Sequence, residues 1–207
     1  MIYHFVYPFV DEYTVLNVVR YITFRTAYAS LTALMLSLLL GPWVIAKLRQ
    51  FQIGQYIQEE APKNHQEKVG TPTMGGVLIV ISVIVPTLLW ADLTNLYIWV
   101  ALVSMVLFAV VGFIDDYLKI VNQRSLGLRV VEKLVLQGLI GLGIAFTLIA
   151  LKGANLYSGA LSVPFFKRFT PDMDLVVLGA STFLPLILFT LLVIIGSSNA
   201  VNLTDGL

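Results

Sequence analysis

The chain has 207 residues, of which 58% are hydrophobic and 12% are charged, and its mean hydropathy is +0.87. A soluble domain has about 45–50% apolar and about 25% charged residues, so this composition excludes an ordinary soluble protein and indicates a membrane protein. The net charge of +1 and the lack of a basic block give no indication of a nucleic-acid partner. The absence of cysteine excludes disulfides and thiolate–metal sites.

Five apolar stretches are long enough to cross a bilayer, which takes about 20 mostly apolar residues. They predict an all-α, polytopic membrane protein with spans at about 26–46, 74–91, 96–114, 132–151 and 175–196. Pro86 and Pro185 are expected to kink the second and fifth spans. Trp90, Tyr97 and Trp99 lie near span ends, where interfacial aromatic residues concentrate.

Five spans place three polar segments on the same side of the membrane, namely 47–73, 115–131 and 197–207. These segments and the adjacent Lys133 carry eight Lys and Arg residues, against five on the other side. The positive-inside rule therefore predicts that the three segments are cytoplasmic. The loop 152–174, on the opposite side, contains LSVPFF and is expected to form a short hairpin or a re-entrant piece.

No internal repeat and no long linker divides the chain, so residues 1–207 are predicted to form a single membrane domain. The last residues, NLTDGL, resemble the middle of a motif more than a natural end. We therefore expect the chain to be the N-terminal part of a longer protein.

Two adjacent carboxylates, Asp115 and Asp116, follow the apolar run that ends at Ile114, and Lys119 comes one turn later. The simpler interpretation is a span end marked by charges, with Lys119 as an i, i+3 or i, i+4 ion-pair partner. It explains one aspartate better than two, because adjacent carboxylates repel each other and a helix C-terminus disfavours anions. A Mg²⁺ ion held by both carboxylates would relieve this repulsion. Alternatively, one carboxylate holds the metal and the other takes a proton.

The segment KVGTPTMGG, residues 68–76, runs directly into the second predicted span. A helix N-terminus presents free backbone N–H groups that bind phosphate, and Lys68 adds a positive charge. Thr71 or Thr73 is in position to cap the helix. The segment lacks the Gly-Lys-Ser/Thr of a Walker A loop. The alternative is a capped helix start whose glycines serve packing only.

A third polar segment, NAVNLTDGL (199–207), contains Asn199, Asn202 and Asp205 at intervals of three residues. On a helix these residues form one polar stripe, and the asparagine amides suit a nucleobase, a ribose or a phosphate-bound water. The alternative is a solvated helix end with a turn at Asp205-Gly206.

Other polar and small residues allow simpler explanations. Lys133 either faces the cytoplasmic side or snorkels from the start of the fourth span. His4 and His65 are lone histidines with no second ligand nearby in the sequence, so we predict no metal role for them. Close helix packing is the expected role of the glycines in the fourth span, Gly138, Gly141 and Gly143.

Together the three polar segments would supply carboxylates for Mg²⁺, a helix N-terminus for phosphate and amides for a polar head group. This combination predicts phosphoryl transfer between a soluble, phosphate-bearing donor and an acceptor embedded in the membrane. An ion-coupled transporter is an alternative, but it would place its carboxylates nearer mid-span. A CDP-alcohol phosphotransferase would need further aspartates that the chain lacks. A structural scaffold is the alternative if the three segments do not meet.

The motifs GTPTMGG, GFIDDYLK and NAVNLTDGL, in that order, resemble the phospho-N-acetylmuramoyl-pentapeptide transferases. These form the MraY family of the polyprenyl-phosphate sugar-1-phosphate transferases. The resemblance extends along essentially the whole chain, looks closest to proteobacterial members, and covers the N-terminal part of a family with ten spans. It implies transfer of phospho-MurNAc-pentapeptide from UDP-MurNAc-pentapeptide to undecaprenyl phosphate, which gives lipid I and UMP and requires Mg²⁺. Another sugar-1-phosphate transferase of this superfamily is the alternative.

The resemblance also assigns roles to matching residues. Asp115 and Asp116 match the catalytic pair at the metal, and Lys119 is expected to act with them. The expected substrate-binding residues are Lys68, Thr73, Lys133, Asn199, Asn202 and Asp205. The implied partners are the two substrates, the lipid bilayer and a second copy of the chain.

The resemblance further implies a multi-pass protein of the bacterial cytoplasmic membrane, with its active face in the cytoplasm. Several features of the family do not occur in these residues: the second half of the TDGLDGL motif, a later Mg²⁺-binding aspartate and a histidine-rich loop. We therefore expect residues 1–207 to be inactive by themselves.

Overall fold

The computed structural model describes residues 1–50, 74–122, 127–166, 168–177 and 180–205. The chain divides into two compact units, Met1–Arg129 and Val130–Leu207. Four helices are long and apolar enough to cross a membrane, and a shorter apolar helix accompanies them. The prediction of an all-α, polytopic membrane protein is therefore confirmed. The prediction of a single membrane domain stays a prediction.

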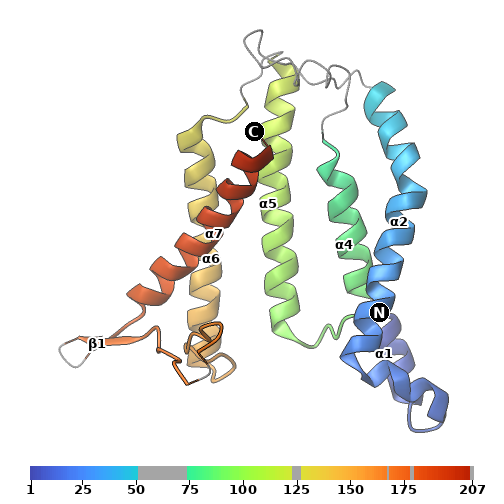
Figure 1. Ribbon diagram of the computed structural model, residues 1–207, viewed down its shortest axis with the longest axis horizontal. Helices are drawn as coiled ribbons and strands as arrows, with labels where there is room; N and C mark the ends of the chain where they lie inside the picture. Colours follow the sequence, from blue (N-terminus) through green and yellow to red (C-terminus); the bar gives the residue numbers. More distant parts are fainter. Residues whose placement is uncertain (51–73, 123–126, 167, 178–179, 206–207) are drawn as a thin grey trace. The chain divides into compact units, whose positions relative to one another are not determined.

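The first unit is built on three apolar helices, α2 (Ile22–Gln50), α4 (Gly76–Trp90) and α5 (Leu96–Val121). Helix α4 packs against both α2 and α5. Gly41 of α2 is buried on the side of Leu78 in α4, where an added Cβ would lie 3.7 Å from Leu78 Cδ2 in ordinary van der Waals contact. The end of α2, the start of α4 and the end of α5 lie at the same end of the unit (Figure 1).

The opposite end of the first unit is covered by short helical turns, α1 (Ile2–Val6), η1 (Tyr7–Phe9) and η2 (Thr14–Arg20). They are anchored to the loop after α4, because Leu93 donates its backbone N–H to His4 Nε2 at 2.8 Å. The interfacial aromatic residues are where the sequence predicts them. Trp90 is the last residue of α4, and Tyr97 and Trp99 lie in the first turn of α5.

The second unit pairs helix α6 (Val130–Gly153) with helix α7 (Leu184–Asp205). A Cβ added to the buried Gly141 would lie 2.8 Å from Leu191 Cδ2, so this glycine allows α7 to approach α6 closely. The predicted packing role is confirmed for Gly141 only. A Cβ at Gly138 or Gly143 would meet nothing within 4 Å in the described part of the chain.

The predicted fifth span begins too early. Residues Leu175–Val177 and Ala180–Thr182 form strands β1 and β2, which pair antiparallel before α7 begins at Leu184. The β-branched residues in this stretch favour an extended backbone over a helical one. The predicted kink at Pro185 is also wrong, because Pro185 is the second residue of α7. A proline is tolerated in the first turn of a helix, where its missing N–H would have no helical partner.

The third span continues beyond its predicted end at residue 114, since α5 runs to Val121. Asp115 and Asp116 therefore lie within the helix and not in a loop that follows it. The helix tolerates them because Lys119, one turn further on, neutralises part of their charge. The other spans differ from the prediction by a few residues at each end.

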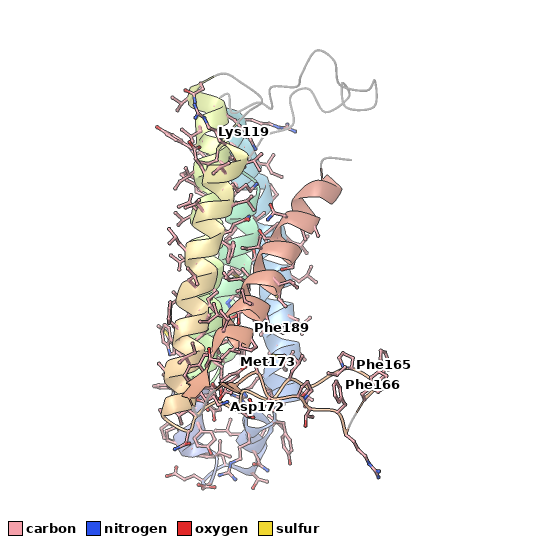
Figure 2. All side chains as sticks on the ribbon, turned by 90° about the vertical axis from the view of Figure 1, so that its left-hand side faces the viewer. Lys119, Phe165, Phe166, Asp172, Met173 and Phe189 are labelled. Atoms are coloured by element: carbon pink, nitrogen blue, oxygen red, sulfur yellow. The ribbon has the colours of Figure 1, made fainter. Side chains whose placement is uncertain are left out.

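The loop between α6 and β1 is organised around Lys152, in the last turn of α6. Its ammonium group pairs with Asp174 and lies 3.2 Å from Asp172 Oδ1. Backbone hydrogen bonds close this loop, including Met173 N–H to the Gly159 carbonyl at 3.0 Å. Beyond this ordered base, the exposed Phe165 and Phe166 project away from the helices (Figure 2).

We predict that Gly141→Val destabilises the whole protein, because the added side chain would overlap Leu191 on α7. Overpacking of this kind costs about 1–3 kcal/mol. Thermal unfolding in detergent measures the effect. Gly143→Val is the matched control, since it is the same substitution on the same helix. Equal melting temperatures for the two variants would contradict the packing role of Gly141.

Candidate functional site

The cluster of Asp115, Asp116 and Lys119 lies near the C-terminal end of α5. Lys119 Nζ is 2.7 Å from Asp115 Oδ2 and 3.1 Å from Asp116 Oδ1. These are the i, i+4 and i, i+3 spacings at which helical side chains meet. The lysine thus bridges both carboxylates and offsets the repulsion between them.

The two aspartates differ in their surroundings. The side chain of Asp115 is 12% exposed, whereas that of Asp116 is 32% exposed. Asp115 uses both carboxylate oxygens, because Oδ1 also accepts the backbone N–H of Leu128 at 2.9 Å. Asp115 is therefore held within the protein, and Asp116 is the more accessible carboxylate.

The segment that follows α5 returns to Asp115 at Gly127 and Leu128. A Cβ at Gly127 would lie 2.6 Å from Asp115 Oδ1 and 2.9 Å from its Cγ, so no side chain fits there without a shift. Glycine at this position lets the backbone approach the carboxylate closely. The geometry of Asp115 thus depends on residue 127 as well as on its own helix.

The donor set of this cluster suits a hard divalent cation only in part. Mg²⁺ is usually bound in proteins by one or two carboxylates together with substrate phosphates and water. Asp115 and Asp116 provide the carboxylates, but no group of three or more His, Cys, Asp or Glu side chains gathers among the described residues. Among the described residues, the cluster therefore offers two carboxylates, and both oxygens of Asp115 already have partners.

A second polar cluster joins α6 to α7 in the second unit. Gln137, which is 1% exposed, donates from Nε2 to Ser198 Oγ at 3.0 Å. Its Oε1 accepts a hydrogen bond from Asn199 Nδ2 at 2.7 Å, and Asn199 Nδ2 also donates to the Ile195 carbonyl at 2.8 Å. Polar side chains that bond across helices in this way stabilise helix pairs within a membrane.

The remaining predicted site residues are only partly placed. Lys133 is half-buried in the first turn of α6. Asn202 and Asp205 lie in the last turns of α7, but their side chains are outside the described part of the structure. Lys68, Thr71, Thr73 and His65 lie outside the described residues altogether. The N-cap of α4 is Gly75, so the prediction that Thr71 or Thr73 caps this helix is wrong.

The predicted meeting of the three polar segments therefore stays a prediction. Within the first unit, the start of α4 and the Asp115 end of α5 share one end (Figure 1). Within the second unit, the hydrogen bonds of Gln137 bring the first half of α6 next to the last turns of α7.

Sequence reasoning missed Gln137, Gly127 and Leu128. Gln137 had a readable signal, because a glutamine in the apolar run VVEKLVLQGLIGLG has to find a polar partner inside the membrane. Gly127 and Leu128 had none, since the backbone contact with Asp115 appears only when the chain folds back.

Comparison with known families agrees with the motifs. The profile described as glycosyl transferase family 4 matches residues 98–207, and the phospho-N-acetylmuramoyl-pentapeptide-transferase signature 1 matches residues 68–80. The first match includes both clusters described above. The second covers the segment that leads into α4.

Individual relatives carry the same name, phospho-N-acetylmuramoyl-pentapeptide-transferase. The chain is 50% identical over 202 residues to that of Koribacter versatilis, which is 95% of this chain and 53% of the relative. It is 48% identical to that of Solibacter usitatus, over 100% of this chain and 57% of the relative. It is 51% identical to that of Desulfatibacillum aliphaticivorans, over 100% of this chain and 54% of the relative. The chain spans about half the length of the curated relatives that it matches.

We predict that Gly127→Ala displaces the backbone at Leu128 and weakens its hydrogen bond to Asp115. The free energy of unfolding should fall by about 1–3 kcal/mol, and the Leu128 amide should exchange faster with solvent. Gly112→Ala on α5 is the control, because a Cβ there meets nothing within 4 Å among the described residues. Unchanged exchange at Leu128 in Gly127→Ala would contradict the close approach.

We predict that Gln137→Leu destabilises the α6–α7 pair, because it removes both interhelical hydrogen bonds and leaves Ser198 and Asn199 without them. Bonds of this kind are worth about 0.6–2 kcal/mol in a membrane. A double-mutant cycle of Gln137→Leu with Asn199→Ala, read by reversible unfolding in detergent and SDS, measures the coupling. Strictly additive effects would show that the two side chains do not interact.

Proposed function

Because the chain belongs to glycosyl transferase family 4, on the branch of the phospho-N-acetylmuramoyl-pentapeptide transferases, we propose that the whole protein catalyses the reaction in this name. It transfers phospho-MurNAc-pentapeptide from UDP-MurNAc-pentapeptide to undecaprenyl phosphate, and the products are lipid I and UMP. This is the first membrane step of peptidoglycan synthesis. Residues 1–207 supply part of the active site and are inactive alone.

The observation that carries the proposal is the pair of carboxylates bridged by Lys119 near one end of α5. The reaction brings an anionic acceptor phosphate to an anionic diphosphate, so it depends on positioning and on neutralising charge. In this cluster the carboxylates supply a proton acceptor, and the Lys119 ammonium group supplies a positive charge.

The two aspartates take different roles in this proposal. Asp116, the more exposed, faces the acceptor phosphate and takes its proton on a carboxylate oxygen. Asp115 is a positioning residue, because its oxygens hold the Lys119 ammonium group and the Leu128 backbone. This division follows from their different hydrogen bonding and burial.

Asp115 and Asp116 would hold Mg²⁺, which neutralises charge on the donor diphosphate when it is bound. Lys119 occupies one oxygen of each carboxylate, so it would have to release at least one of them for the metal to bind. Once the donor binds, the lysine is positioned to turn towards a phosphate oxygen.

The donor substrate would contact residues from several segments. We assign phosphate and nucleotide binding to Lys68, Thr73, Lys133, Asn199, Asn202 and Asp205. The contacts of Asn199 limit its role, because its amide nitrogen already donates to Gln137 and to the Ile195 carbonyl. Only the carbonyl Oδ1 of Asn199 then remains to accept a hydrogen bond from a ligand.

The apolar helices and the relatives indicate a multi-pass membrane protein. We place it in the bacterial cytoplasmic membrane with the Asp115 end of α5 in the cytoplasm, where a soluble nucleotide substrate is available. A second copy of the chain is a further expected partner.

Two other functions are less well supported. An ion-coupled transporter would need its carboxylates near mid-span, but Asp115 is the twentieth residue of the 26 in α5. Another sugar-1-phosphate transferase of the same superfamily would use similar catalytic residues. The signature at residues 68–80 favours the pentapeptide-bearing donor.

The proposal is tested by UMP release from UDP-MurNAc-pentapeptide by the whole protein in detergent, with undecaprenyl phosphate and Mg²⁺. Asp116→Asn should lower kcat by at least about a hundredfold while the melting temperature stays unchanged. Asp115→Asn should lower both kcat and the melting temperature, because it also disturbs Lys119 and Leu128.

Control reactions separate the alternatives. Replacement of the donor by UDP-N-acetylglucosamine should abolish UMP release, whereas turnover of that donor would favour another transferase of the superfamily. Full turnover by both asparagine variants would exclude the carboxylate pair from catalysis. Asp11→Asn is a matched control, because that exposed aspartate pairs with Arg20 at the other end of the first unit.

A further inference from the structure

The first unit contains a cavity at the end opposite to Asp115, between the first half of α2, the second half of α4 and the start of α5. Its volume is about 490 Å³, within the range of about 300–1,000 Å³ that is usual for ligand sites. Its lining includes Arg25, Ser82, Trp90 and Asp92. The cavity thus combines apolar helix surface with polar and charged groups of both signs.

Two of the lining side chains have polar atoms that the described residues leave unsatisfied. Ser82, which is 6% exposed, has a buried Oγ with no hydrogen-bond partner among them, and Arg25 has a buried Nε in the same condition. Burial of such groups without partners is costly, and within a membrane there is no bulk water to compensate. A ligand with hydrogen-bond acceptors would satisfy both groups.

The cationic side chain in the lining of the cavity, Arg25, is held in position by an aromatic ring. The guanidinium carbon of Arg25 lies 4.3 Å from the centre of the Tyr3 ring, so the side chain is held by a cation–π contact. Its planar group presents several N–H donors in the geometry that suits a phosphate. Arg20 does not compete for this role, because it pairs with Asp11 at 2.6 Å on the exposed surface.

The lining of the cavity also includes an anionic side chain, Asp92. Asp92 Oδ1 accepts hydrogen bonds from the Thr94 hydroxyl at 2.7 Å and from the Thr94 backbone N–H at 3.1 Å. These bonds lower the pKa of Asp92, so the carboxylate stays ionised at neutral pH. The same oxygen, Oδ1, lies 3.6 Å from His4 Nε2. The cavity therefore offers one cation and one anion to a ligand.

The aromatic residues around the cavity indicate its level in the membrane, and this level indicates which molecules can reach it. Trp90 ends α4, Tyr97 and Trp99 begin α5, and Tyr28 packs against Trp90 with ring centroids 5.2 Å apart. Aromatic residues gather in this way at the level of the lipid head groups. A site at this level that offers hydrogen-bond donors to a phosphate and a carboxylate to an ammonium group matches a zwitterionic head group.

We propose that this cavity binds the phosphoethanolamine head group of a membrane phospholipid, with the phosphate on Arg25 and Ser82 and the ammonium on Asp92. The ligand is a lipid of the surrounding bilayer and not free phosphate, since apolar helices and the interfacial Trp90 line the cavity. The site is separate from the carboxylate cluster of α5 and does not depend on the proposed transferase activity.

Native mass spectrometry of the whole protein, stripped of lipid in detergent, tests this assignment. Phosphatidylethanolamine, phosphatidylglycerol and phosphatidylcholine with the same acyl chains are titrated separately. We expect the first to bind about tenfold more tightly than the other two. Phosphatidylglycerol has no ammonium group, and phosphatidylcholine cannot donate a hydrogen bond to Asp92. Millimolar inorganic phosphate should displace none of the bound lipid.

Variants identify the cavity as the site. Arg25→Gln should weaken phosphatidylethanolamine binding about tenfold, and Asp92→Asn should abolish the preference over phosphatidylglycerol. Ala29→Leu fills the cavity without removing a charge and should also reduce binding. Arg20→Gln is the matched control and should bind as the unmodified protein does. Thermal unfolding confirms that each variant is folded.

Three outcomes would overturn the assignment. One is equal binding of the three lipids, and another is unchanged binding in both Arg25→Gln and Ala29→Leu. The third is that the whole protein binds no lipid. This result would show that another part of the protein occupies the cavity. None of these results affects the carboxylate cluster, whose test is UMP release.

Discussion

The structure depends on one constraint of the bilayer, namely that a polar group inside it must find its partner within the protein. Lys119 meets this requirement for Asp115 and Asp116 within a single helix, and so α5 can carry two carboxylates past the predicted end of the span. Gln137 meets it between two helices, where it bonds to both Ser198 and Asn199. These contacts hold the polar residues in fixed positions within an otherwise apolar chain.

The same constraint separates residues that serve the fold from residues that are available for chemistry. Asp115 and Gln137 are nearly buried, and both oxygens of Asp115 and both amide atoms of Gln137 have partners within the protein. Asp116 is more exposed and has only one oxygen engaged by Lys119. Arg25 and Ser82 have buried atoms that no described residue satisfies. The residues whose polar atoms have partners within the protein maintain the geometry of the fold. A ligand gains most binding free energy at the residues whose polar atoms are exposed or unsatisfied.

Much of the fold could be predicted from the sequence, because apolar length is a local property. The spans, their aromatic ends and the ion pair of Lys119 follow from spacing along one helix. The start of α7 could not be read in this way, since LVVLGAST is apolar enough for a span but its β-branched residues pair as strands. Pro185 was misjudged for the same reason, because the effect of a proline depends on its distance from the helix start.

The sequence by itself determined that this is a membrane protein, that its motifs resemble the phospho-N-acetylmuramoyl-pentapeptide transferases, and that Lys119 lies at the spacing of an ion-pair partner for Asp115 and Asp116. Only the tertiary structure decided that the two aspartates differ, because the difference comes from the backbone of Gly127 and Leu128 folding back onto one of them. It also decided that Asn199 bonds to Gln137, and that Arg25, Ser82 and Asp92 line one cavity. The physical reason is that burial and hydrogen bonding arise between segments far apart in the chain, whereas a sequence pattern records only neighbours.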